Sequence, residues 1–139
     1  MSRGTGKETV YSNGVKTFPR DSGNTKIKTA AYTVLAADLL GSTIIVDSDA
    51  AVTLTLPLIA GAGDGGIVTL VNNKPGQLLT VDPNAVDGIN FGDQVADGVT
   101  VVNTALTAKK GDFIKLATVS SASTYWSVVD IQGIWAVGA

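Results

Sequence analysis

Carboxylates are the only side chains in this 139-residue sequence that are numerous enough to suggest chemistry, because the chain has no histidine and no cysteine. Those two absences exclude Ser–His and Cys–His catalysis, thiolate metal sites and disulfides. Two groups of side chains could offer oxygen ligands to Ca²⁺, namely Asp87, Asn90 and Asp93, and Asp47 with Asp49. Neither group has the closing glutamate of a calcium loop, since Glu8 is the only glutamate. We interpret both groups as turn residues and expect no metal and no cofactor.

Two further patterns could indicate an enzyme, and we find both unconvincing. A pair of aspartates could hydrolyse a glycosidic bond, but nearly all ten aspartates of residues 29–139 fall at expected turns. The glycine-rich run 61–66 resembles a phosphate-cradling loop, but it lacks the Gly-Lys-Ser/Thr ending and no helical pattern follows it. We interpret this run as a surface loop or subunit contact. The sequence therefore predicts a protein that is not an enzyme and has no catalytic residue.

The composition favours an all-β domain. Apolar residues make up 45% of the chain, charged residues 16% and aromatic residues 6%, and there are 16 glycines. A core can therefore be built, but it must consist mainly of Val, Ile, Leu and Ala. Many glycines with few aromatics are typical of short strands joined by tight turns.

Alternating apolar and polar residues predict strands along the body of the chain. The clearest alternation covers residues 52–56, where Val52, Leu54 and Leu56 are separated by threonines. Strands are expected over 31–35, 43–47, 51–56, 67–71, 78–81, 89–91, 99–102, 113–117 and 125–129, with a short helical turn at 36–41. No fixed repeat length is visible, which argues against a parallel β-helix. We expect an antiparallel β-sandwich or a small Greek-key or jelly-roll-like barrel.

Residues 1–29 are expected to form an extended basic N-terminal arm, with residues 30–139 as the body. Residues 1–28 hold six basic and two acidic residues, a net charge of +4, whereas residues 29–139 have a net charge of −6. The arm cannot bury enough apolar surface to fold alone. The basic residues expected to contact a partner are Arg3, Lys7, Lys16, Arg20, Lys26 and Lys28.

The partner of the arm has three possible identities. An acidic protein surface, on a neighbouring copy or on another protein, fits the charge asymmetry best. Nucleic acid fits less well, because the cations are spread out without interleaved aromatic residues. The third possibility is a solvated tail that contacts nothing.

The end of the chain is unusually apolar, with Ile131, Ile134, Trp135 and Val137 within its last nine residues. Such a tail either closes the sandwich or packs against a neighbouring subunit, and Ile134 and Trp135 are the candidate contact residues. Trp126 lies within an expected strand and is predicted to be core. No apolar run approaches the roughly 18 residues that span a bilayer, and residues 1–28 lack a signal-peptide pattern. We therefore expect no membrane contact.

Several short motifs in the body resemble a β module of tailed-bacteriophage virion proteins. The motifs are Tyr32-Thr33-Val34, Ala37-Asp38, Gly41, Ile44 to Asp47, Val52 to Pro57, Lys110 to Ile114, Tyr125 to Val128, and the ending Gly133-Ile134-Trp135-Ala136. The resemblance covers roughly residues 30–139. It carries no catalytic residues, and the module is shared by head decoration proteins and by parts of tail fibres and baseplates.

The chain is most similar in plan to small head decoration, or cement, proteins, because it is one short module without a fibre shaft. The resemblance implies a homotrimer that binds the major capsid protein on the outer surface of the virion capsid, after synthesis in the bacterial host cytoplasm. Its implied role is to bridge neighbouring capsid subunits and stabilise the assembled head. The alternative is a tail fibre or baseplate module that binds another protein or a host glycan.

Overall fold

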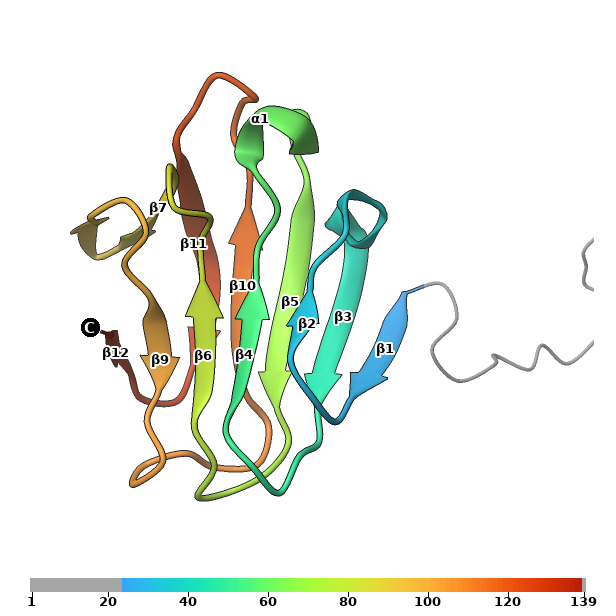
Figure 1. Cartoon of the computed structure of the whole chain (residues 1–139), viewed down its shortest axis with the longest axis vertical. Helices are drawn as coiled ribbons and strands as arrows, with labels where there is room; N and C mark the ends of the chain where they lie inside the picture. Colours follow the sequence, from blue (N-terminus) through green and yellow to red (C-terminus); the bar gives the residue numbers. More distant parts are fainter. Residues whose placement is uncertain (1–23, 139) are drawn as a thin grey trace, which may run out of the picture.

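The computed structural model describes residues 24–138, which form two β-sheets packed face to face (Figure 1). The strands are β1 (Thr25–Lys28), β2 (Tyr32–Thr33), β3 (Leu40–Val46), β4 (Val52–Thr55), β5 (Ile67–Asn72), β6 (Leu79–Asp82), β7 (Gly88–Phe91), β8 (Asp93–Val95), β9 (Val101–Asn103), β10 (Asp112–Ala117), β11 (Tyr125–Gln132) and β12 (Trp135–Val137). The helical segments η1 (Ala36–Leu39) and α1 (Ile59–Ala62) are single turns. The predicted all-β sandwich is confirmed.

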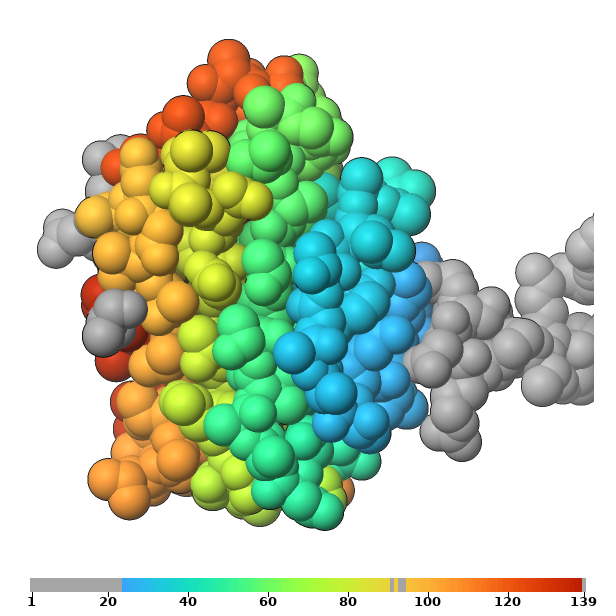
Figure 2. Space-filling model, in the orientation of Figure 1, coloured from blue at the N-terminus to red at the C-terminus, as the bar shows by residue number. Residues whose placement is uncertain are grey.

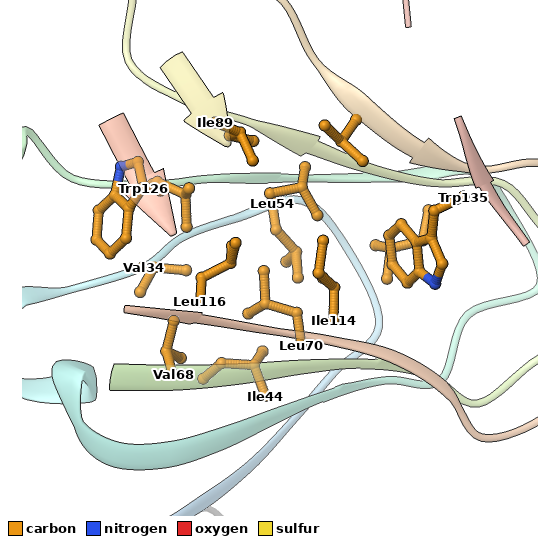
Figure 3. Close-up of a cluster of buried hydrophobic side chains, with 14 of the residues drawn as sticks. Val34, Ile44, Leu54, Val68, Leu70, Ile89, Ile114, Leu116, Trp126 and Trp135 are labelled. Carbon is orange, nitrogen blue, oxygen red and sulfur yellow. The ribbon is translucent and has the colours of Figure 1, made fainter. Parts of the chain in front are cut away.

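The core lies between the two sheets and is built by alternation. In β4, Val52 and Leu54 are buried while the threonines beside them are partly exposed, and the same pattern runs through β5, β6 and β10. Side chains of successive strand residues point to opposite faces, so one face of each strand enters the core. Trp126 and Trp135 lie at opposite ends of the buried aliphatic residues (Figure 3). The prediction that Trp126 is core is confirmed.

The two sheets are mixed rather than purely antiparallel. The larger sheet has the order β1-β3-β5-β10-β11-β7-β8, and the smaller has the order β12-β9-β6-β4-β2. From β1 to β6 the chain alternates between the sheets, and each strand runs parallel to the one two before it. The first half of the described chain is therefore wound like a short parallel β-solenoid whose strands alternate between the two sheets. We call it the parallel coil. The expected antiparallel pairing holds where β9, β10, β11 and β12 join β5, β6 and one another.

The parallel coil was missed in the sequence because its turns differ in length. Thr25 pairs with Thr43 18 residues later, but Thr43 pairs with Thr69 26 residues later. In the smaller sheet Tyr32 pairs with Leu54 and Val52 with Leu79, offsets of 22 and 27 residues. Unequal loops remove the fixed period by which parallel coils are recognised in a sequence.

The body begins earlier than the charge pattern suggests. Strand β1 pairs with β3 along the edge of the larger sheet, so the last residues of the expected arm belong to the sandwich. Figure 2 shows β1 and β2 (blue) together at one edge of the molecule, with the orange and red C-terminal part at the opposite edge. Arg3, Lys7, Lys16 and Arg20 lie outside the described residues. No helix within residues 24–138 is long and apolar enough to cross a membrane.

Candidate partner-binding surfaces

The three buried aspartates accept hydrogen bonds from backbone N–H groups. Asp38, Asp87 and Asp112 are buried, and their carboxylates accept hydrogen bonds of 2.9 Å from the backbone N–H groups of Leu35, Ile59 and Lys109 respectively. Each carboxylate thereby satisfies a donor that folding removes from water. Among the described residues no three His, Cys, Asp or Glu side chains are placed to hold a metal ion.

The glycine-rich run is fixed to the neighbouring loop. Thr118 Oγ1 accepts a hydrogen bond from the Gly66 N–H at 2.8 Å and donates one to the Gly63 carbonyl at 2.9 Å. A Cβ on Gly66 would lie 3.1 Å from the Leu39 Cβ, so this glycine is needed for close packing. The run is therefore part of the fold, and the N–H groups of Gly61, Gly65 and Gly66 already donate hydrogen bonds within the chain.

Lys26 and Lys28 contact the chain's own body. Lys26 Nζ lies 2.7 Å from Asp38 Oδ1 and donates to the Tyr32 hydroxyl at 3.2 Å. The Tyr32 hydroxyl donates to Asp38 Oδ2 at 2.7 Å, and Lys28 Nζ lies 4.3 Å from the centroid of the Tyr32 ring. This cluster closes the β1–β2 side of the sandwich. Strand β1 belongs to the sheet, and its pairing brings the Lys26 and Lys28 side chains against Tyr32. Whether these two lysines also meet a partner stays a prediction.

The cluster sets the ionisation of its members. Burial by itself would raise the pKa of Asp38, but hydrogen bonds from Lys26, Tyr32 and the Leu35 N–H outweigh it and hold that pKa below its usual range. The hydrogen bond to Asp38 raises the pKa of Lys26. Burial, followed by the hydrogen bond to Asp38, raises the pKa of Tyr32. The ion pair thus favours the charged forms of both Asp38 and Lys26.

Replacing Lys26 by methionine should destabilise the protein by about 1–3 kcal/mol at pH 7, because the Asp38 carboxylate keeps its burial and loses its cation. An aspartate whose pKa is lowered by folding contributes stability above its unfolded pKa, and that contribution is lost as the pH falls through the folded value. The difference in the free energy of unfolding between Lys26→Met and the wild type should therefore shrink as the pH falls below about 4. Urea unfolding at several pH values measures it.

Lys74 provides the matched control for this substitution. Its Nζ lies 3.3 Å from the almost fully exposed Asp49 carboxylate, and exposed ion pairs contribute little. Lys74→Met should leave the free energy of unfolding nearly unchanged at every pH. A pH-independent deficit in Lys26→Met would contradict the assigned role of the ion pair.

A second buried polar group holds the C-terminal turn. Asn103 Nδ2 donates to Asp112 Oδ2 and to the Ile134 carbonyl, both at 3.1 Å, and Asn103 Oδ1 accepts from Asn72 Nδ2 at 2.7 Å. All three side chains are buried, so these bonds have no competition from water. They join β5, β9 and β10 to the turn between β11 and β12.

That turn presents an apolar surface, which we call the C-terminal edge and define as Val129, Ile131, Ile134 and Val137. These side chains are 52%, 39%, 58% and 54% exposed. The predicted contact residue Ile134 is thus accessible, but whether it meets a partner stays a prediction. Trp135 is not accessible: its ring packs into the core, and its Nε1 donates to the Gln132 carbonyl at 2.9 Å. Of the two alternatives for the tail, closure of the sandwich is correct for Trp135.

The outer face of the larger sheet has an apolar row that the sequence analysis did not identify. Register places Ile27 beside Ile45, Ile45 beside Val71, and Val71 beside Phe113, so the row crosses four strands. All four side chains are partly exposed, and they alternate with the core residues of their strands. We call these four residues the apolar row. Its sequence signal is an apolar residue at the polar-face position of an alternating strand.

The outer face of the smaller sheet is different. Its central row consists of Thr53 beside Thr80, followed by Val102, and a second row places Thr33 beside Thr55 and Asp82. Threonine is a common residue on the solvated face of a sheet. The two outer faces of the sandwich therefore differ in character.

Comparison with known proteins gives no guide to the use of these surfaces. No protein-family model, no curated protein and no solved structure matches the chain.

Proposed function

We propose that this chain is a non-enzymatic structural protein of a bacteriophage virion, which binds the outside of the assembled head and bridges neighbouring capsid subunits. The observation that carries the proposal is the contrast between the two outer faces. One face holds an apolar row in register across four strands, whereas the other is dominated by threonine. The sequence motifs typical of virion proteins supply the kind of partner.

The apolar row suits a broad, flat contact. Ile27, Ile45, Val71 and Phe113 lie on adjacent strands, so they form one continuous strip rather than scattered residues. Apolar side chains at the centre of a contact, surrounded by polar ones, are typical of protein interfaces. Thr25, Thr43 and Thr69 form the neighbouring row and can provide that polar surround.

The position of β1 connects this face to the basic N-terminal segment. Ile27 is one end of the apolar row, and residues 1–23, with Arg3, Lys7, Lys16 and Arg20, directly precede this strand in the chain. A partner that lies on the apolar row is thus close to the point where the basic segment joins β1. An acidic patch on the capsid surface would bind that segment and strengthen the attachment.

The roles of the buried aspartates support a function other than catalysis. Asp38, Asp87 and Asp112 each bind a backbone N–H, and two of them also bind side chains of the fold. Each of these three carboxylates has a structural partner, so the proposal assigns none of them as a catalytic group. A decoration protein needs no such groups, because it acts by adding buried contact area to a shell that is already assembled.

The test is binding of the full-length chain to purified heads that lack it, measured as copies retained per head after sedimentation. Ile45→Lys and Val71→Lys should each weaken binding about tenfold or more, because the contact would bury an unpaired charge. Thr53→Lys and Thr80→Lys are matched controls on the outer face of the other sheet and should bind normally. Full occupancy by folded Ile45→Lys and Val71→Lys would contradict the assignment of this face.

The same experiment examines the alternative location. Cryo-electron microscopy of the mixture should show regular densities over the head lattice. Density confined to tails or baseplates would contradict head decoration and support a tail fibre or baseplate module instead. Bound heads should also resist heating better than bare heads, since a ligand that binds only the assembled shell stabilises it.

A further inference from the structure

The two ends of the sandwich differ in charge. At one end lie the loops that contain η1 and α1, together with the loop 118–124 (Figure 1). Segments 34–40, 57–66 and 118–124 hold two charged residues: Asp38, which is buried and already paired, and the exposed Asp64. The loops at the opposite end hold five charged residues, namely Asp47, Asp49, Lys74, Lys109 and Lys110.

The end with few charges exposes aliphatic side chains. We call the side chains of Leu35, Leu40, Leu58 and Val119 the α1 end, and they are 50%, 82%, 44% and 70% exposed. Leu35 and Leu40 flank η1, α1 contacts η1, and Leu58 directly precedes α1. Asp64 Oδ1 accepts a hydrogen bond of 2.6 Å from the N–H of residue 121, which fixes the Val119 loop beside the loop after α1. Exposed aliphatic side chains that gather in this way indicate a contact surface.

The N-terminal segment joins the body beside the α1 end. Lys26 Nζ lies 2.7 Å from Asp38 Oδ1, and Asp38 belongs to η1. The Asn24 carbonyl accepts a hydrogen bond from the Thr43 N–H, and Thr43 lies in β3, which directly follows η1. Residues 1–23 therefore enter the fold next to η1.

The segment has the apolar side chains and the length to reach this surface. It contains Val10, Tyr11, Val15 and Phe18. Phe18 precedes residue 24 by six residues, and an extended chain spans about 3.3 Å per residue, so Phe18 can lie up to about 20 Å from that point. The three residues of β3 between Thr43 and the first residue of the strand span only about 10 Å. The leucines beside η1 are therefore within reach of Phe18.

Charge and tethering favour this segment over a separate partner. Residues 1–23 hold four basic and two acidic residues, and Lys16 and Arg20 flank Phe18. Asp64, the exposed charge among the loops of the α1 end, has the opposite sign. A segment tethered by a short connection has an effective concentration in the millimolar range, so even a weak contact is populated.

We propose that in the free chain the segment around Phe18 docks on the α1 end, with the Phe18 ring against the exposed leucines and with Lys16 and Arg20 beside Asp64. Docking removes the ring and the leucines from water. The contact lies within one chain, so it needs neither a second copy nor a virion head. It holds the two basic residues at the body until a more acidic surface competes for them.

The test is the proximity of the segment to the α1 end in the full-length chain. Because the chain has no cysteine, Ser12→Cys provides a single site for a nitroxide spin label. The label should broaden the amide NMR signals of Leu40 and Leu58 and leave the signal of Leu106, at the opposite end, sharp. Phe18→Ser should lower the docking equilibrium constant about tenfold or more and thereby remove most of this broadening.

Matched variants of the body complete the test. Leu58→Ser should also reduce the broadening, whereas Leu106→Ser is the control and should leave it unchanged. Leu58 and Leu106 are 44% and 100% exposed, so neither change disturbs the core. Absence of broadening at the α1 end would overturn the proposal. Broadening that survives Phe18→Ser or Leu58→Ser undiminished would overturn it equally, because it would reflect the tether alone.

A mixed sample decides between docking on the chain's own body and docking on another copy. Spin-labelled chains without isotope label are mixed with isotope-labelled chains that lack the cysteine. This mixture should show no broadening at Leu40 or Leu58. Broadening in the mixture would mean that the segment reaches a second copy, which would overturn the intramolecular contact.

Failure of this proposal is distinguishable from failure of the proposed function. Docking is measured without heads and depends on Phe18 and Leu58, whereas head binding is tested at Ile45 and Val71. A chain that decorates heads without docking its segment would reject this inference alone. A chain that docks its segment and does not bind heads would reject only the decoration role.

Discussion

Gly133→Ala should lower the free energy of unfolding by about 3–5 kcal/mol, a large effect for the addition of one methyl group. Gly133 has a φ of +96°, which disfavours any residue with a Cβ. A Cβ at this position would also overlap the Asp112 carboxylate. That carboxylate cannot move away without breaking its bonds to the Lys109 N–H and Asn103 Nδ2. Urea unfolding of the full-length chain measures the loss.

Gly76→Ala is the matched control. Gly76 also has a positive φ, +77°, but a Cβ there would meet nothing within 4 Å. Its cost should be limited to backbone strain, about 1 kcal/mol. Similar losses at Gly133 and Gly76 would show that contact with Asp112 adds nothing.

A double mutant isolates that contact. Asp112→Ala is itself destabilising, because Asn103 and the Lys109 N–H lose a buried acceptor. It also removes the group that the new Cβ would overlap, so the cost of Gly133→Ala should be smaller in the Asp112→Ala background. If the costs of Gly133→Ala and Asp112→Ala are additive, the loss in Gly133→Ala comes from strain elsewhere in the turn and not from contact with Asp112.

The strands with strict alternation were predictable from the sequence. Residues 51–56 alternate because one face of the strand enters the core, and the segment contains strand β4. Residues 67–71 were predicted from their run of β-branched and aliphatic residues and form most of β5. Strand β12 was not predicted because Trp135-Ala136-Val137 has no polar residue to mark an outer face. Strand β1 was not predicted because Lys26 and Lys28 suggest a solvated segment, and their partners Tyr32 and Asp38 are not adjacent in the sequence.

Pairing and register could not be predicted, and both candidate surfaces depend on them. Ile27, Ile45, Val71 and Phe113 are far apart in the sequence and form a row only through the pairing of β1, β3, β5 and β10. Ile134 was identified from the apolar tail alone. The exposed positions of Val129 and Val137 could be recognised only from the topology, in which β7 covers part of β11 and β12 ends its sheet. A local pattern shows which residues are apolar, but the topology decides which of them share a surface.

Trp126→Ala should cost about 3–5 kcal/mol, because it leaves a large cavity at one end of the core. Trp126 is fully buried and lies in the buried cluster at the end opposite Trp135 (Figure 3). Chemical denaturation, with circular dichroism to confirm the native fold, provides the measurement. A loss below about 1 kcal/mol would mean that this end of the core collapses around the missing ring.

Replacing each tryptophan by phenylalanine shows what the indole nitrogens contribute. Within residues 24–138, Trp126 Nε1 is buried without a hydrogen-bond partner, whereas Trp135 Nε1 donates to the Gln132 carbonyl. Trp126→Phe therefore removes an uncompensated polar group along with some apolar area, and the two effects oppose each other. Trp135→Phe loses area and also a hydrogen bond worth about 1 kcal/mol. Trp135→Phe should thus be the costlier change, and the reverse order would mean that the area lost at Trp126 outweighs the hydrogen bond that closes the β11–β12 turn.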